Sequence, residues 1–138
     1  MKVQVIRSNR KTIGLEVRAD ESVILRAPAV DEISDVEWKS ILGEFTERVN
    51  HFCKIMEVTV GRITIRNQKT RWGSCSSKGN VNFNYQLYYM PRELMDYVII
   101  HELSHRRHMN HSAEFWQEVE KYCPAYRECR KKLRDYEI

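Results

Sequence analysis

The pattern His101-Glu102-x-x-His105 constrains this chain more than any other feature. Residues four apart on an α-helix lie one above the other, so a helix here presents two imidazoles on one face. Two imidazoles at that spacing can bind one divalent metal, and the glutamate beside the first can accept a proton from a water molecule. The sequence therefore predicts a helix that carries a metal site.

The residues before this pattern favour the same helix. Pro91 suits the first helical position, where its missing N–H is not needed. Leu94 and Val98 precede His101 and His105 at helical spacing, so the imidazoles continue an apolar face.

A third histidine, His111, follows ten positions after His101. In the pattern H-E-x-x-H-x-x-G-x-x-H, a turn at the glycine returns the third histidine to the metal. His108 occupies that glycine position here, so we expect either an unusual backbone conformation at His108 or a turn at Asn110, since Asn tolerates left-handed backbone. A helix that continued would make His108 the third ligand instead. Further alternatives are Glu114, Glu118 and Glu120.

Neutral imidazole is a good zinc ligand, and a catalytic zinc keeps three protein ligands and a water molecule. The sequence therefore predicts one Zn²⁺ per chain on His101, His105 and His111, with Glu102 as the catalytic base. The residue that would stabilise an oxyanion stays open among Arg71, His108, Tyr88, Tyr89, Tyr122 and Tyr126.

A chain of 138 residues most simply forms one domain. We expect an N-terminal β segment over 1–28, followed by a helix, a sheet and the metal-site helices over 31–138. No stretch approaches the roughly 20 apolar residues of a membrane span, and the N-terminus has no signal-peptide core. We therefore expect a cytoplasmic protein with no membrane partner. The cysteines, which form no C-x-x-C pair, are expected to be reduced thiols: Cys53, Cys75, Cys123 and Cys129.

The net charge of +4 is mild, although basic residues cluster at several places, including Arg7 to Lys11 and Arg127 to Arg134. Such clusters can bind nucleic acid, but they are more often a solvated surface. Nucleic acid is therefore a possible partner that the sequence does not favour.

Hydrophobic periodicity predicts both strands and helices. Residues 2–27 alternate as a small antiparallel sheet with turns at Asn9-Arg10 and Asp20-Glu21. Ser34 and Glu37 form a capping box that opens a helix. Its apolar stripe comprises Trp38, Ile41, Leu42, Phe45, Val49, Phe52 and Met56.

Further strands are expected around 58–65, then a strand and tight turn over 69–80, then a strand over 81–86 with Asn82, Asn84 and Gln86 on its polar face. One strand of this region could line the cleft and pair with an extended peptide. Two C-terminal helices follow, one capped by Ser112 and one after Pro124.

Several distinctive segments occur in order along the chain. They are Arg71-Trp72-Gly73-Ser74-Cys75, Asn82-Phe83-Asn84, Asp96 to His105, and Asn110-His111-Ser112 with Phe115-Trp116. Together they resemble the YgjP-like metallopeptidase domain, a family similar to the SprT-like and WLM groups of small zincins. The resemblance is close over residues 58 to about 134.

This resemblance implies an α+β fold, a compact zincin-like domain with small antiparallel sheets packed on helices and the H-E-x-x-H pattern on a central helix. It also implies zinc on His101, His105 and His111, with the segment Arg71 to Cys75 close to the active site. We assign substrate contact to Arg71, Trp72, Asn82 and Asn84.

Three functions are consistent with these residues. The leading hypothesis is a zinc-dependent metallopeptidase acting on peptides or proteins. A second is a metal-dependent hydrolase of nucleotide phosphoanhydrides, in which Lys69, Arg71, Arg106 or Arg107 would bind the phosphates. A third is a non-catalytic binding module with a structural zinc closed by a fourth ligand, for which His108 or Cys75 would serve.

Overall fold

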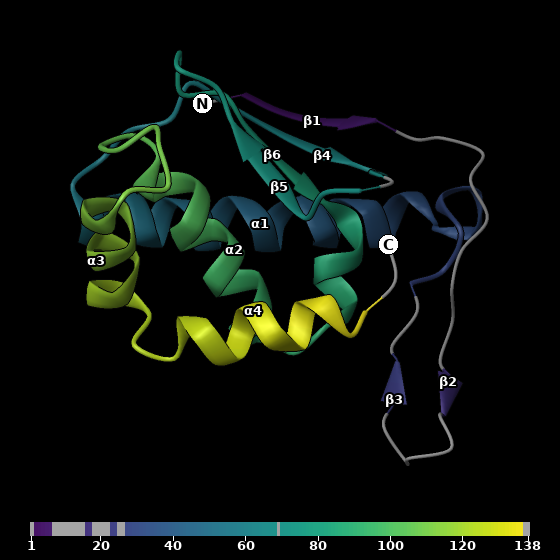
Figure 1. The fold of residues 1–138 in the computed structure, drawn as a ribbon. Coiled ribbons are helices and arrows are strands. Elements are labelled where there is room, and N and C mark those ends of the chain that lie inside the picture. The colour runs from purple at the N-terminus through teal and green to yellow at the C-terminus, as the bar shows by residue number, and fades with distance from the viewer. Residues whose placement is uncertain (1, 7–15, 18–22, 25–26, 69, 137–138) are drawn as a thin grey trace.

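The computed structural model describes residues 2–6, 16–17, 23–24, 27–68 and 70–136 (Figure 1). The chain forms a mixed α+β fold, as predicted. The strands are β1 (Lys2–Ile6), β2 (Glu16–Val17), β3 (Val23–Ile24), β4 (Arg62–Arg66), β5 (Gly73–Cys75) and β6 (Val81–Asn84). The helices are η1 (Val30–Glu32), α1 (Asp35–Met56), η2 (Tyr85–Tyr89), α2 (Arg92–Ser104), α3 (Ala113–Tyr122) and α4 (Tyr126–Arg134).

The main sheet has four strands in the order β1-β4-β6-β5. β1 pairs with β4 in parallel, β4 with β6 in parallel, and β5 with β6 antiparallel. The prediction of one antiparallel sheet over residues 2–27 is therefore wrong for β1, because β1 pairs in parallel with β4. Parallel strands need a long crossover connection, and α1 lies in the connection between β1 and β4. β2 and β3 pair antiparallel in a separate sheet, as predicted. The turns predicted at Asn9-Arg10 and Asp20-Glu21 lie outside the described residues.

Helix α1 begins as the capping residues predict. The Ser34 hydroxyl accepts a hydrogen bond from the backbone N–H of Glu37 at 3.1 Å. The predicted apolar stripe is buried except for the partly exposed Leu42. Phe45 stacks on Phe83 of β6 with ring centroids 5.7 Å apart, so α1 covers one face of the main sheet.

The β5–β6 hairpin forms as predicted, but β6 ends at Asn84 and the chain continues as η2. The predicted polar face is not solvated, since Asn84 and Gln86 are buried. Asn84 accepts from the backbone N–H of Gln86 and donates to the carbonyls of Gln68 and Arg71. Its amide therefore pairs with backbone, and it fixes the segment that leads into β5.

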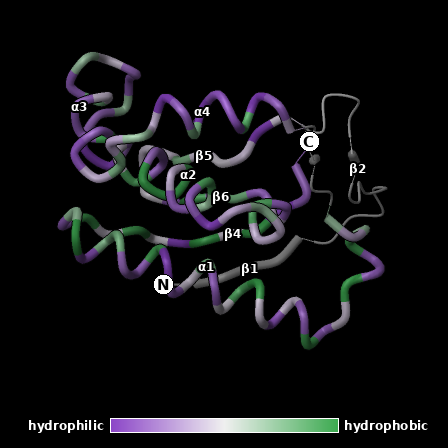
Figure 2. The backbone as a smooth tube through the Cα atoms, turned by 90° about the horizontal axis from the view of Figure 1, so that it is seen from below, coloured by the Kyte–Doolittle hydropathy of each residue, from purple (hydrophilic) through white to green (hydrophobic). Residues whose placement is uncertain are grey.

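Helix α2 is the most buried helix, and α3 and α4 pack against it. The Ser112 hydroxyl accepts from the N–H of Phe115 and opens α3, as predicted. α4 buries Tyr126, Cys129 and Leu133, yet most of its remaining residues are hydrophilic (Figure 2). All four cysteines are free thiols. Among the described residues, no helix has the length and apolar content that crossing a membrane requires.

Candidate metal centre

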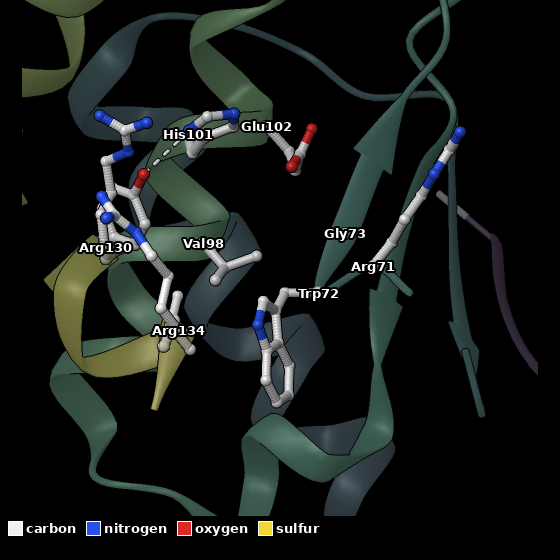
Figure 3. A pocket seen from close by; sticks show the side chains of 10 residues that line it. Arg71, Trp72, Gly73, Val98, His101, Glu102, Arg130 and Arg134 are labelled. Atoms are coloured by element: carbon white, nitrogen blue, oxygen red, sulfur yellow. Dashed lines mark hydrogen bonds between the residues drawn. The ribbon is translucent and has the colours of Figure 1, made fainter. Parts of the chain in front are cut away.

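The last turns of α2 carry His101 and Glu102, and the Glu102 side chain points toward β5 (Figure 3). His105 follows as the C-cap residue of the same helix. Glu102 is 7% exposed and His105 is 8% exposed, whereas His101 is half-buried. The predicted helix therefore carries the H-E-x-x-H pattern.

The chain turns directly after α2 and brings His111 back to the helix. The N–H of Arg107 and that of His108 both donate to the carbonyl of Ser104. In the described part of the chain, the one residue other than glycine with a positive φ is Glu57. The expectation of a left-handed residue at His108 or Asn110 is therefore wrong, because ordinary right-handed turns already reverse the chain.

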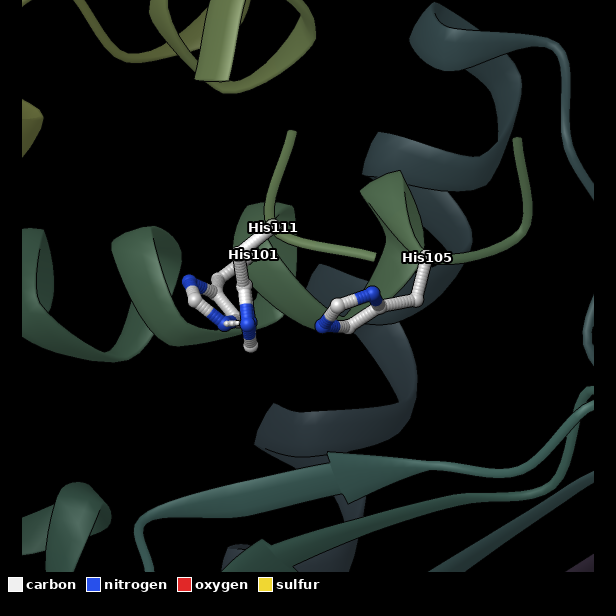
Figure 4. A group of neighbouring side chains, drawn as sticks. All are labelled: His101, His105 and His111. Carbon is white, nitrogen blue, oxygen red and sulfur yellow. Dashed lines mark hydrogen bonds between the residues drawn. The ribbon is translucent and has the colours of Figure 1, made fainter. Parts of the chain in front are cut away.

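The three imidazoles of His101, His105 and His111 converge (Figure 4), with one ligand atom of each within 4.8 Å of the others. Nε2 of His101 lies 3.3 Å from Nε2 of His111. Zinc–nitrogen bonds of about 2.0–2.1 Å at a tetrahedral angle place two ligand nitrogens about 3.3 Å apart. The spacing and chemistry of this pair therefore fit two ligands of one zinc ion.

The alternative ligands do not join this group. His108 contributes its backbone carbonyl, which lies 3.0 Å from Nδ1 of His105. Glu118 pairs with Arg107 at 3.6 Å, and Glu114 and Glu120 are exposed. Within the described residues, the cluster of metal-ligating side chains consists of the three histidines alone.

Each helical imidazole has a fixed partner on its far nitrogen. Nδ1 of His101 lies 3.1 Å from the Tyr97 hydroxyl, one turn earlier on α2. Nδ1 of His105 faces the carbonyl of His108. Partners of this kind fix the tautomer and the ring orientation of metal-binding histidines, leaving Nε2 toward the metal.

Two aromatic residues at the start of α3 support the imidazole rings. Phe115, which is fully buried, stacks on His105 with centroids 4.5 Å apart and meets His101 edge-on at 5.0 Å. Trp116 stacks on His111 at 5.9 Å. The start of α3 therefore holds the site from the side opposite β5.

Burial changes the pKa of the central groups. Together with a smaller effect of positive charge on the neighbouring imidazoles, it lowers the pKa of His101 to about 3. Burial also lowers the pKa of His105. A histidine must be neutral to bind a metal, so these lowered pKa values favour the form of His101 and His105 that can bind one. Burial raises the pKa of Glu102 to about 8, against the opposing charge of Arg71.

The segment Arg71 to Cys75 lies beside the site, as the resemblance implies. A Cβ on Gly73 would lie 3.1 Å from Cγ of Glu102 and 3.1 Å from the Val98 side chain. β5 therefore approaches α2 closely at Glu102, and a side chain at position 73 would crowd both neighbours.

Two cavities meet at His101 and Glu102. One, of about 340 Å³, lies toward α4, and Arg71 and Trp72 line it. The other, of about 270 Å³, lies toward Cys75 and the exposed Met109. Together they form a cleft that passes the three histidines.

The residues predicted to contact substrate divide into two groups. Arg71 and Trp72 line the cleft, whereas Asn82 and Asn84 line neither of its two cavities. Asn82 donates to the Ser74 hydroxyl at 3.0 Å and so joins β6 to β5. Both asparagines support the edge of the cleft from behind.

The tyrosines considered for oxyanion stabilisation line neither cavity of the cleft. Tyr89 donates to Glu37 of α1, and Tyr88 packs against Tyr89. Tyr126 stacks on Trp116, and Tyr122 lies under Lys121. His108 lines neither cavity of the cleft. Among the residues considered, Arg71 alone lines the cleft, and it lines both cavities.

Sequence reasoning missed Tyr97 as a partner of His101 and the arginines of α4 as cleft residues. The spacing of four between Tyr97 and His101 could have indicated their contact. No sequence signal places Arg130 and Arg134 at the cleft, because their position depends on how α4 packs on α2.

Comparison with solved structures shows the same fold elsewhere. The metallopeptidase zymogen abylysin of Pyrococcus abyssi is 27% identical with a TM-score of 0.60, covering 64% of this chain and 90% of that one. A Wss1 mutant from Saccharomyces cerevisiae is 12% identical with a TM-score of 0.60, covering 95% of this chain and 92% of that one. Wss1 itself is 14% identical with a TM-score of 0.58, covering 95% and 91%.

A search of curated proteins found no match. The family model of the YgjP-like metallopeptidase domain, in contrast, matches residues 29–136. This range contains the three converging histidines, Glu102 and both cavities of the cleft. The chain therefore belongs to the YgjP-like metallopeptidase domain family.

Proposed function

We propose that the chain is a zinc-dependent peptidase in which His101, His105 and His111 hold one zinc ion and Glu102 is the general base. The observation that carries this proposal is the convergence of three imidazoles beside a buried carboxyl group where two cavities meet. A zinc ion bound there would act as a Lewis acid toward the substrate carbonyl and would lower the pKa of a bound water molecule.

The position of Glu102 supports its assignment as the general base. Glu102 follows His101 directly on α2, lines both cavities, and is 7% exposed as a residue. A carboxylate in this place can accept a proton from water on one side of the cleft and pass it to a leaving amine on the other. Arg71, which lines both cavities, is the cation best placed to steady negative charge on a carbonyl oxygen.

An extended peptide suits the shape of the site. β5 is one of the two edge strands of the main sheet in the described part of the chain, and it runs beside Glu102. An edge strand offers backbone N–H and C=O groups that an extended peptide can pair with. The presence of this edge strand therefore favours a peptide substrate that lies along the cleft.

The alternatives fit less well. Of the cations considered for phosphate binding, Arg106 donates to the carbonyls of Thr59 and Ser77, away from the cleft. Arg107 donates to the carbonyls of Met56 and Glu57, and Lys69 lies outside the described residues. A structural zinc needs four protein ligands, and the cluster seen in the described part of the chain has three.

The test compares zinc-loaded wild type with Glu102→Gln on an unstructured protein and on a panel of nucleotides. Wild type should cleave the protein, while Glu102→Gln should retain zinc by elemental analysis but lose at least about 100-fold in rate. Glu120→Gln, an exposed glutamate on α3, is the matched control and should keep full activity. Full protease activity in Glu102→Gln, or hydrolysis of nucleotides alone, would refute the proposal.

A further inference from the structure

The larger cavity of the cleft has an unusual combination of walls. Trp72, Val98 and Leu133 give it apolar surface, and three arginines surround it: Arg71, Arg130 and Arg134. We call it the arginine pocket. Figure 3 shows Arg130 and Arg134 on one side and Arg71 on the other, with Glu102 and His101 at the end next to the metal centre.

No salt bridge between described residues involves Arg71, Arg130 or Arg134. Salt bridges in the described part of the chain involve other cations, namely Arg48, Arg92, Arg107 and Lys132. Arg130 lies over the Trp116 ring at 4.4 Å, which orients it without cancelling its charge. The one carboxyl group that lines the pocket is Glu102, so positive charge exceeds negative charge there.

We propose that the arginine pocket binds a carboxylate of the substrate, carried by the residue next to the scissile bond. This proposal rests on the proposed peptidase function and adds the substrate class, peptides with an acidic residue at that position. Guanidinium groups bind carboxylates through charge-assisted hydrogen bonds. A volume of about 340 Å³ is at the small end for ligand pockets and matches one or two side chains.

The walls favour a side-chain carboxylate over a phosphate. Trp72, Val98 and Leu133 can contact the methylene groups of Glu or Asp, whereas a phosphate has no apolar part to place there. The acidic side chain would lie with its carboxylate toward α4 and its backbone beside β5.

The first experiment measures specificity. Zinc-loaded wild type is given matched peptides that carry Glu, Gln or Lys at the positions flanking the cleaved bond, each with a free and an amidated C-terminus. At one flanking position, kcat/KM should be about tenfold higher for Glu than for Gln. A preference that depends only on the free C-terminus would assign the pocket to the terminal carboxylate instead of a side chain.

Charge reversal on α4 localises the effect. Arg134→Glu should abolish the preference for Glu and favour Lys, because the pocket then lacks one cation and gains an anion. Lys131→Glu makes the same charge change on the exposed surface of α4 outside the pocket and should keep the preference. Equal cleavage of Glu and Gln peptides, or equal loss in both variants, would overturn the proposal.

A binding measurement separates this proposal from the peptidase proposal. Zinc-free protein is titrated with N-acetylglutamate, N-acetylglutamine and inorganic phosphate, with tryptophan fluorescence as the readout because Trp72 lines the pocket. N-acetylglutamate should bind about tenfold more tightly than N-acetylglutamine in wild type but not in Arg134→Glu. If no peptide is cleaved but N-acetylglutamate still binds more tightly than N-acetylglutamine, the carboxylate-binding proposal is supported and the peptidase proposal is refuted. Equal binding, or tighter binding of phosphate, overturns the carboxylate pocket.

Discussion

Replacing Tyr97 by Phe should weaken zinc binding while leaving the fold intact. Nε2 of His101 is the atom that faces His111, at 3.3 Å, and Nδ1 faces the Tyr97 hydroxyl at 3.1 Å. The tautomer that leaves Nε2 free for a metal carries its proton on Nδ1, so Nδ1–H donates to the tyrosine oxygen. Tyr97→Phe keeps the ring but removes this acceptor.

The expected loss follows from that contact. The Nδ1–H of the half-buried His101 loses its partner, and the imidazole is no longer held in the ligand tautomer. Removing the partner of a metal-binding histidine typically costs about 10–100-fold in metal affinity. We expect the dissociation constant for zinc to rise about tenfold, which corresponds to about 1.4 kcal/mol.

The assay is competition for zinc with a chromogenic chelator at neutral pH. Tyr89→Phe is the control, because it removes a hydroxyl that donates to Glu37 at 2.6 Å, away from the metal centre. Both variants should lose similar thermal stability, whereas only Tyr97→Phe should lose zinc affinity. Wild-type affinity in Tyr97→Phe would show that Tyr97 does not orient His101.

Two further perturbations test the site. Gly73→Ala would place a Cβ 3.0 Å from the carbonyl oxygen of Asn82 and 3.1 Å from Cγ of Glu102, so β5 must shift away from α2. We expect kcat to fall about tenfold with zinc still bound. An unchanged kcat would contradict the close approach of β5 to α2. In zinc-free protein, the folded state raises the pKa of Glu102 to about 8 from its ordinary 4.5, so between these pH values the folded state binds more protons than the unfolded state. The free energy of unfolding should therefore fall as pH rises through that range, by at most about 1.4 kcal/mol per pH unit. His101, with a folded pKa of about 3 against 6.5, has the opposite sign, and its stability contribution falls as pH decreases below 6.5. Urea unfolding between pH 6.5 and 8 isolates Glu102: the decline should disappear in Glu102→Gln, and identical curves for variant and wild type would contradict the shift.

Local sequence patterns predicted the elements that depend on local physics. Ser34 and Ser112 cap helices because their hydroxyls reach N–H groups three residues ahead, and the structure shows both bonds. The H-E-x-x-H spacing and the apolar residues before it predicted α2, which is observed. These features were accessible because their interactions span a single helical turn.

Non-local pairing explains where sequence reasoning failed. β1 pairs in parallel with β4, although α1 lies between them in the sequence, and no local pattern specifies so distant a partner. Asn84 is polar and alternates with apolar residues, so it resembles an exposed position, yet three backbone groups pair with its buried amide. The alternation of polar and apolar residues along a strand indicates which side chains are polar. It does not indicate whether distant backbone groups form hydrogen bonds with a buried polar side chain.

The sequence by itself determined that two imidazoles and a carboxyl group share one helix, because helical geometry fixes residues one and four positions apart. Only the tertiary structure decided what surrounds them. The turn after α2 returns His111 without a left-handed residue, and α3 sets aromatic rings against the histidines. Likewise, the packing of α4 on α2 brings Arg130 and Arg134 to the cleft. Contacts between elements far apart in the chain depend on the packing of the whole core, which no short pattern encodes.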